Sequence, residues 1–306
     1  MTFGLLLIVL ASVLFGTTGT SATFLHSLYG LDPLTVGVWR LFFGAPFLLL
    51  ASWSITKSTG LSALNKSHVL AVLLFGAALA GYQLSFFQAV IRTQIATATL
   101  LAICTAPLMV AFLARIFLKE RLSGRVLVAL ALALPGTALI IGLHGIDAVL
   151  SPAYLSGNLL ALAAALSYAT CVVAGKDLVG RLHPIQAVTL AFTVAALLML
   201  PLAGIPRNLP LAGWLILVYL GLFPTAVAYV LFGLGLKKVT ATASSVATLV
   251  EPLVATLLAV GLMGERLTAA GWGGAILLLA ALVVLSVPER TPTAPETVES
   301  LQDKPF

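Results

Sequence analysis

The fold of this chain is decided by two related stretches, QIATATLLAICTAPLMVAFLARIFLKERL at residues 94–122 and VTATASSVATLVEPLVATLLAVGLMGERL at residues 239–267. Aligned at a constant offset of 145 residues, the two stretches are identical at 11 of 29 positions. They share Ala-Thr-Ala near the start, Pro-Leu in the middle and Glu-Arg-Leu at the end. Each contains an apolar run of about 20 residues, the length of a helix that crosses a bilayer core of ~30 Å. We therefore expect two related transmembrane helices in corresponding halves of the chain.

The composition of the whole chain extends this expectation to a complete membrane protein. Of its 306 residues, 60% are hydrophobic and only 8% are charged, and the mean hydropathy is +1.13. A soluble domain carries about a quarter charged residues. Lipid offers no hydrogen-bond partner to the backbone, so only helices or a closed barrel can span it. Unbroken apolar runs favour helices over the alternating segments of roughly 10 residues that build a barrel. The predicted fold class is an all-α integral membrane protein.

Ten apolar segments are long enough to be transmembrane helices. The predicted spans are Phe3–Leu25, Pro33–Trp53, Val69–Ile91, Ala96–Phe117, Arg125–Leu143, Leu155–Gly175, Ile185–Ala203, Leu211–Leu236, Ala241–Leu262 and Thr268–Val287. Because Met1 to Gly4 contain no Lys or Arg, we expect the first span to be permanent and not a cleaved signal peptide. Residues 289–306 are rich in Pro, Thr and Glu, and we expect a disordered cytoplasmic tail there.

The distribution of Lys and Arg predicts the orientation of these spans. With the N-terminus inside, 12 basic residues lie on the inner side and 3 on the outer side, while Arg40 lies within a span. Cytoplasmic loops of membrane proteins carry such an excess of Lys and Arg. We therefore expect a multi-pass protein of the cytoplasmic membrane with both termini in the cytoplasm. The net charge of +6 does not indicate nucleic-acid binding, since the basic residues stand singly or in pairs at segment ends.

The repeated stretches divide the chain into two halves of five spans each, residues 1–148 and 149–288. Five is an odd number, so the second half enters the membrane from the opposite side. The result is an inverted-topology repeat, which is typical of secondary transporters whose substrate site lies near the midplane where the halves meet. Two such copies with slightly different conformations can exchange them, which gives two states of similar energy that open to opposite sides.

Several short motifs resemble those of the EamA family of the drug/metabolite transporter superfamily. They are Ala-x-Ala, Pro-Leu and Glu-Arg-Leu in both halves, Phe15-Gly16, Trp39-Arg40 and Glu251-Pro252. The resemblance implies ten helices around a central cavity lined by spans 1, 3, 4, 6, 8 and 9. It also implies export of amino acids, drugs or other metabolites. Phe15 stands where the family often has Trp, and Tyr82-Gln83 in span 3 also departs from the pattern, so the substrate stays open.

Glu251 is the first candidate for a functional residue, because it lies near the middle of a predicted span. Ionisable groups in the membrane are costly and usually mark function. This carboxylate can exchange a proton against a cationic or amino-bearing substrate, or serve a structural role at Pro252 or beside Arg40. Arg40 lies about 10 Å from the start of its helix. It can bind a substrate carboxylate, although snorkelling toward the outer headgroups is the interpretation we favour for it.

Other candidate residues line up on the same helix faces or at the same depth. Ser244 and Thr248 share one face of span 9 with Glu251, and a second polar face in span 1 should also point into the protein. Pro107 and Pro252 interrupt spans 4 and 9 at equivalent positions, as hinges or as static kinks. For all of these residues the sequence leaves open whether they line a cavity or pack helices together. The span 1 face comprises Ser12, Gly16, Gly19, Thr20 and Thr23, and the aromatic and amide candidates are Tyr82, Gln83, Phe86, Tyr168 and Tyr229.

Motifs of other protein classes are missing from the sequence. It contains no GxxxxGK[ST] loop, no HExxH and no Cys/His cluster, so we expect no cofactor, no metal and no catalytic residues. We predict a secondary transporter that exports a small metabolite, such as an amino acid, a drug-like molecule or an organic cation, as a monomer or weak homodimer. Proton coupling and uncoupled flux both stay open. The alternatives are a nucleotide-sugar or organophosphate exchanger, a membrane scaffold and a membrane-embedded enzyme.

Overall fold

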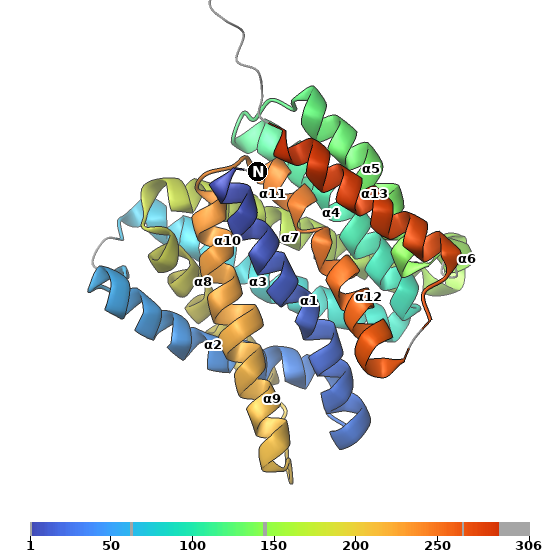
Figure 1. The fold of residues 1–306 in the computed structure, drawn as a ribbon. Coiled ribbons are helices and arrows are strands. Elements are labelled where there is room, and N and C mark those ends of the chain that lie inside the picture. The colour runs from blue at the N-terminus through green and yellow to red at the C-terminus, as the bar shows by residue number, and fades with distance from the viewer. Residues whose placement is uncertain (1, 62–63, 143–145, 265, 288–306) are drawn as a thin grey trace, which may run out of the picture.

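A computed structural model describes residues 2–61, 64–142, 146–264 and 266–287 of the chain (Figure 1). These residues form helices and contain no strand, and ten of the helical segments are long and apolar enough to cross a membrane. The elements are α1 (Phe3–Tyr29), α2 (Pro33–Thr56), α3 (Lys66–Arg92), α4 (Ile95–Phe117), α5 (Gly124–Ile141), α6 (Ile146–Leu150), η2 (Pro152–Tyr154), α7 (Leu155–Arg181), α8 (Pro184–Met199), η3 (Leu200–Leu202), α9 (Leu211–Gly221), η4 (Leu222–Val227), α10 (Ala228–Leu236), α11 (Ala241–Ala247), α12 (Val250–Met263) and α13 (Ala269–Ser286).

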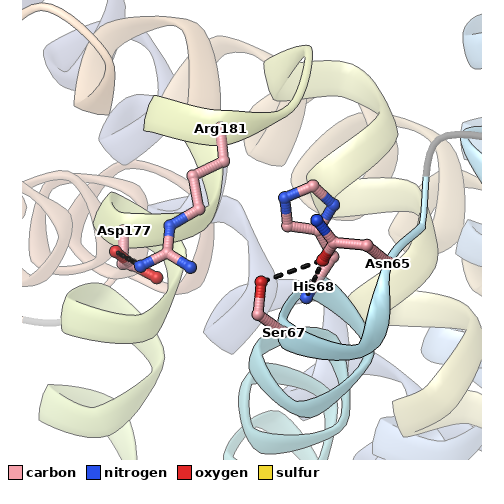
Figure 2. Close-up of polar contacts among 5 residues, drawn as sticks. All are labelled: Asn65, Ser67, His68, Asp177 and Arg181. Carbon is pink, nitrogen blue, oxygen red and sulfur yellow. Dashed lines mark hydrogen bonds and ion pairs between the residues drawn. The ribbon is translucent and has the colours of Figure 1, made fainter.

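The helix boundaries follow from local capping chemistry. The Asp32 side chain accepts a hydrogen bond from the Thr35 N–H at the start of α2, where Pro33 takes the first helical position. Asn65 caps α3 in the same way, since its Oδ1 accepts from the His68 N–H at 2.9 Å (Figure 2). Gly30 ends α1 with φ of 65°, a left-handed conformation that glycine adopts readily.

The ten predicted spans are confirmed, with helices that run a few residues further in several places. The first span continues to Tyr29 and the sixth to Arg181. The first Glu-Arg-Leu turn lies between α4 and α5, while Glu265 of the second turn lies outside the described residues. The expected tail at residues 289–306 also lies outside them.

Span 8 contains a wider helical turn that the sequence analysis did not predict. The π-helical segment η4 separates α9 from α10 and contains Pro224. Proline has no N–H to donate to the carbonyl four residues earlier. That carbonyl belongs to Leu220, and it accepts a hydrogen bond of 2.8 Å from the Thr225 hydroxyl. A buried backbone acceptor is thereby satisfied within the irregular turn.

Span 9 is interrupted between α11 and α12 by one tightened turn at Thr248 and Leu249, whose backbone angles stay right-handed helical, and we call this turn the break in span 9. Pro252 cannot donate to the Thr248 carbonyl, which accepts a bond of 2.9 Å from the Glu251 N–H. This hydrogen bond spans three residues where a regular α-helix spans four, and it marks the turn between α11 and α12. The equivalent Pro107 lies inside α4, which continues without a break. The two related spans thus differ in conformation at the same sequence position.

The packing of the helices is similar for the two halves. α7 packs against α3 and α4, while α1 packs against α10 and α12 (Figure 1). α8 contacts α3, and α2 contacts α9; α5 lies beside α13, and α2 beside α8. Each span of the first half corresponds to the span five places later in the chain. When both members of a contact are replaced by their counterparts, the result is again one of these contacts; the α5–α13 and α2–α8 contacts are each replaced by themselves. Ala161, Ala165 and Ala169 are fully buried and form a small-residue seam along α7. Small residues of this kind let neighbouring helices approach closely.

One side of the bundle collects the start of α1 and several other helix ends, and we call it the N-terminal side. A Cβ on Gly4 would lie 2.7 Å from Lys238 Cβ, so α1 begins close to the end of α10. The Lys176 ammonium at the end of α7 donates to the Leu236 and Val239 carbonyls, at 2.8 and 2.6 Å. Arg125 at the start of α5 donates to the Val287 carbonyl after α13. The opposite side is called the far side below.

Candidate functional site

A pocket of about 40 Å³ lies at the break in span 9 and has room for a few water molecules. Both halves of the chain contribute to it. Three of its residues in the first half face their own counterparts at an offset of 145, namely Ile103 with Thr248, Ala106 with Glu251, and Pro107 with Pro252. The full lining is Tyr82, Ala102, Ile103, Ala106, Pro107, Tyr168, Ser245, Thr248, Leu249, Glu251 and Pro252.

A second pocket of about 20 Å³ is mainly aromatic. Tyr82 and Tyr168 line both pockets, so the two are neighbours. The Tyr229 ring packs on Phe15 and Phe192, with centroid distances of 4.8 and 4.4 Å. Aromatic walls with a few polar groups are typical of sites for organic ligands. The second pocket is lined by Phe15, Phe75, Leu79, Tyr82, Tyr168, Cys171, Val172, Tyr229 and Phe232.

A chain of hydrogen bonds connects span 6 to the break in span 9. Tyr168 Oη and Thr248 Oγ1 are 2.9 Å apart, and Thr248 Oγ1 donates to the Ser245 carbonyl at 2.8 Å. The Thr248 hydroxyl uses its single hydrogen in the second bond, so the Tyr168 hydroxyl is the donor in the first. The polar end of Tyr168 is therefore held at the pocket wall, and its ring faces the aromatic pocket.

Glu251 lies where α1 and α12 approach each other most closely. A Cβ on Gly16 would lie 2.9 Å from the Glu251 carbonyl oxygen and 2.7 Å from Val254 Cβ. Only glycine permits this distance between the two backbones. The charges of Glu251 and Arg40 interact with each other and with the Tyr82 and Tyr229 hydroxyls. Arg40 Nε is buried without a hydrogen-bond partner, so this part of the side chain lies in the bundle interior.

The N-terminal side below the pocket is closed. Every residue from Ala241 to Val250 is buried, whereas α12 on the far side is partly exposed. The Glu120 carboxylate accepts bonds from the Ala241 N–H at 2.7 Å, and from the Thr242 N–H and hydroxyl at 3.2 Å each. An acid at a helix N-terminus satisfies donors that have no partner in the helix. Glu120 follows the end of α4, and we call its contact with Ala241 and Thr242 the α4–α11 contact.

The predicted site residues fall into two groups. Ser244 is fully buried and donates to the Ala241 carbonyl, and Phe86 stacks on Tyr82 at 5.9 Å; both lie beside the pockets and not in their walls. Ser245 lines the first pocket in place of Ser244, since Ser245, Thr248 and Pro252 follow i, i+3, i+7 spacing on one helix face. Residues in the pocket walls are Tyr82, Pro107, Tyr168, Tyr229, Thr248, Glu251 and Pro252, and the others are Thr20, Arg40, Gln83, Phe86 and Ser244.

The residues of the predicted polar face of span 1 differ in burial. Ser12, Gly16 and Thr20 are buried, but Gly19 and Thr23 on the far-side half of α1 are exposed. A Cβ on Gly19 would meet no atom within 4 Å. The Thr23 hydroxyl is satisfied by the Gly19 carbonyl at 3.0 Å, so this half of the helix needs no polar neighbour.

No group of three or more His, Cys, Asp or Glu side chains that could hold a metal ion occurs in the described residues. Cys104 and Cys171 are both free thiols. Of the histidines in the described segments, His26 lies near the end of α1, His68 near the start of α3, and His183 directly before α8. His144 lies outside the described residues.

The ten apolar helices define the class of the protein as a multi-pass α-helical membrane protein. The sequence profile of the EamA-like transporter family matches residues 2–142 and again residues 155–287. The chain belongs to this family.

Curated relatives agree with this assignment, and a solved structure shares the fold. The chain is 34% identical over 298 residues to the uncharacterized transporter YwfM of Bacillus subtilis, covering 94% of this chain and 96% of the relative. It is 27% identical over 191 residues to a probable terminal-alkyne amino-acid exporter of Streptantibioticus cattleyicolor, covering 61% and 62% of the two chains. A solved crystal structure shares the fold, with a TM-score of 0.78 at 22% identity over 92% of this chain and 95% of that one.

Proposed function

We propose that this protein is a secondary transporter that exports a small metabolite across the cytoplasmic membrane by alternating access. The observation that carries the proposal is the pocket at the break in span 9, where Glu251 lies and where both halves of the chain contribute residues. Discontinuous helices near the midplane are the usual substrate sites of transporters built from repeats. The candidate cargoes are amino acids, drug-like molecules and organic cations.

The pairing of equivalent residues supports an inverted repeat whose axis passes through this pocket. Equivalent prolines, Pro107 and Pro252, lie in the same pocket wall, yet one span is continuous and the other broken. If the two halves exchange these conformations, the break moves to α4 and the opposite side of the bundle opens. The closed N-terminal side and the partly exposed α12 correspond to one of the two states.

The distribution of charged residues supports the proposed orientation, and Glu251 supports the proposed direction of transport. The N-terminal side carries most of the Lys and Arg residues, which favours its placement in the cytoplasm. The Glu251 carboxylate provides a group that can bind either a proton or an amino group of the cargo, but not both at once. Such competition couples efflux of the cargo to influx of protons. The name of the amino-acid exporter among the relatives supports a cargo with an amino group.

Flux in proteoliposomes with an imposed pH gradient tests the proposal. The wild type should move at least one member of a panel of amino acids and organic cations. Glu251→Gln should abolish the dependence of this flux on the pH gradient. Asp177→Asn is the matched control, because Asp177 is an acid at the rim of the bundle, paired with Arg181 at 2.8 Å (Figure 2). It should leave the gradient dependence intact.

Two results would contradict different parts of the proposal. If the wild type moves no member of the panel in either direction, transport of this class of cargo is wrong. If Glu251→Gln keeps full gradient-driven flux of a confirmed cargo, the proton does not act through this carboxylate.

A further inference from the structure

Arg40 and Glu251 are two opposite charges in the bundle interior that do not neutralise each other by contact. Their charges interact, yet no ion pair joins them in the described part of the chain. Tyr82 and Tyr229 lie within the electrostatic range of both groups. The two charges therefore flank the same aromatic region. A charge that is taken from water without a close partner is strongly unfavourable, so such a pair is expected to be completed by a ligand.

Unsatisfied hydrogen-bond donors accompany the positive charge. Among the described residues, Arg40 Nε, Gln83 Nε2 and Thr18 Oγ1 are buried without a hydrogen-bond partner. Gln83 as a whole is only 5% exposed. A buried donor left unpaired loses its hydration without replacement, and native proteins contain few of them. Arg40 Nε and Gln83 Nε2, on α2 and α3, are the two of these groups that one ligand can pair with if they lie close together.

The Gln83 amide lies beside the segment of α2 that carries Arg40. A Cβ on Gly37 would be 3.5 Å from Gln83 Nε2. Gly37 and Arg40 are three residues apart on one helix, so they share a face. The amide and the guanidinium are thus directed to the same region between α2 and α3. Two adjacent donors, one of them charged, match the two oxygen atoms of a carboxylate.

We propose that Arg40 and Gln83 form a carboxylate-binding subsite, opposite Glu251, which gives the transporter preference for a zwitterion over a simple cation. This inference rests on the proposed transport function and specifies the cargo. The two charged side chains sum to zero, so they complement a cargo that also has zero net charge but carries separated ammonium and carboxylate groups. A phosphate would carry additional negative charge, and Glu251 would repel it.

Binding to the purified protein tests the subsite without requiring transport. Thermal unfolding is followed with each standard L-amino acid, and then with the decarboxylated amine of every amino acid that raises the unfolding midpoint. The wild type should bind the amino acid about tenfold or more tightly than its amine, because the amine leaves the Arg40 and Gln83 donors unpaired. Arg40→Gln should remove this difference, and Arg40→Lys should keep part of it.

Matched variants separate recognition of the carboxylate from a purely structural role. Arg181→Gln changes the same residue type at the rim of the bundle, and it should preserve the preference for the amino acid. Gln83→Met keeps the side-chain volume and removes the donor. It should weaken binding of the amino acid several-fold and leave binding of the amine unchanged. This second variant decides the question if Arg40→Gln does not fold.

The proposal would be overturned if the wild type binds the amine as tightly as the amino acid, or if no amino acid binds. It would also be overturned if Arg40→Gln or Gln83→Met weakens binding of both probes equally. None of these results would test transport of an organic cation through Glu251, which the flux measurements described above test separately.

Discussion

Replacing Glu120 by Gln should open the N-terminal side of the bundle. In the structure its carboxylate accepts three hydrogen bonds from Ala241 and Thr242 at the start of α11. A glutamine offers one acceptor oxygen, and its NH₂ group would face at least one of these donors. An unpaired buried donor costs about 1–3 kcal/mol. Loss of the negative charge at the helix N-terminus adds about 0.3–1 kcal/mol.

Together these effects should weaken the α4–α11 contact by about 1–4 kcal/mol, which shifts a two-state equilibrium about 10- to 1,000-fold. Electron spin resonance distances can detect this shift, with nitroxides at the exposed positions Phe117 and Lys237 in a background that lacks Cys104 and Cys171. The wild type should give one short distance, and Glu120→Gln should add a longer one.

The neighbouring exposed residue Arg121 provides the control, since Arg121→Gln leaves the three hydrogen bonds in place. Identical distance distributions for the wild type and Glu120→Gln would refute the claim that this contact holds the N-terminal side closed.

Three further predictions concern packing and hydrogen bonds. Gly16→Ala should lower the unfolding midpoint, at a cost of about 1–3 kcal/mol, because its Cβ would lie 2.7 Å from Val254; Gly19→Ala meets open space and should leave the midpoint unchanged or raise it, and equal effects of the two would contradict the close contact. Thr248→Val should destabilise the protein more than Tyr168→Phe does, by about 1 kcal/mol, since it leaves a buried hydroxyl without its partner; a double-mutant cycle with zero coupling would argue against the bond. Asn158→Leu should cost about 2–3 kcal/mol, because its amide group joins Thr93 to the Ala148 and Val149 carbonyls, and unfolding in detergent that matches the wild type would disprove this role.

Most of the fold could be predicted from the sequence because each span is an apolar run of sufficient length. Helix ends were less certain, since the caps at Asp32 and Asn65 are recognisable but the continuation of α7 to Arg181 depends on the residues that cover it. The positions of Pro107 and Pro252 were also visible in the sequence. Their different outcomes were not, because a proline breaks a helix only where the surrounding packing allows the break.

The candidate site could be predicted in part. Glu251, Thr248 and the three tyrosines lie in the pocket walls, as depth and helical periodicity indicated. The direction of the Arg40 side chain could not be predicted, since the same position on α2 permits it to reach the interface or the interior. The environment of Thr23 could not be predicted either, because a threonine can satisfy its hydroxyl within its own helix whether it faces a cavity or not.

Access to Ala106 from the two sides of the membrane tests the central claim most directly. Ala106 lies in the pocket wall opposite its repeat counterpart Glu251. In sealed vesicles of either orientation, a charged, membrane-impermeant thiol reagent should react with Ala106→Cys, since the pocket opens to each side in turn. Ala165→Cys in the buried seam of α7 should stay unreactive in both. Reaction of Ala106→Cys in only one orientation, or in neither, would contradict alternating access through this pocket.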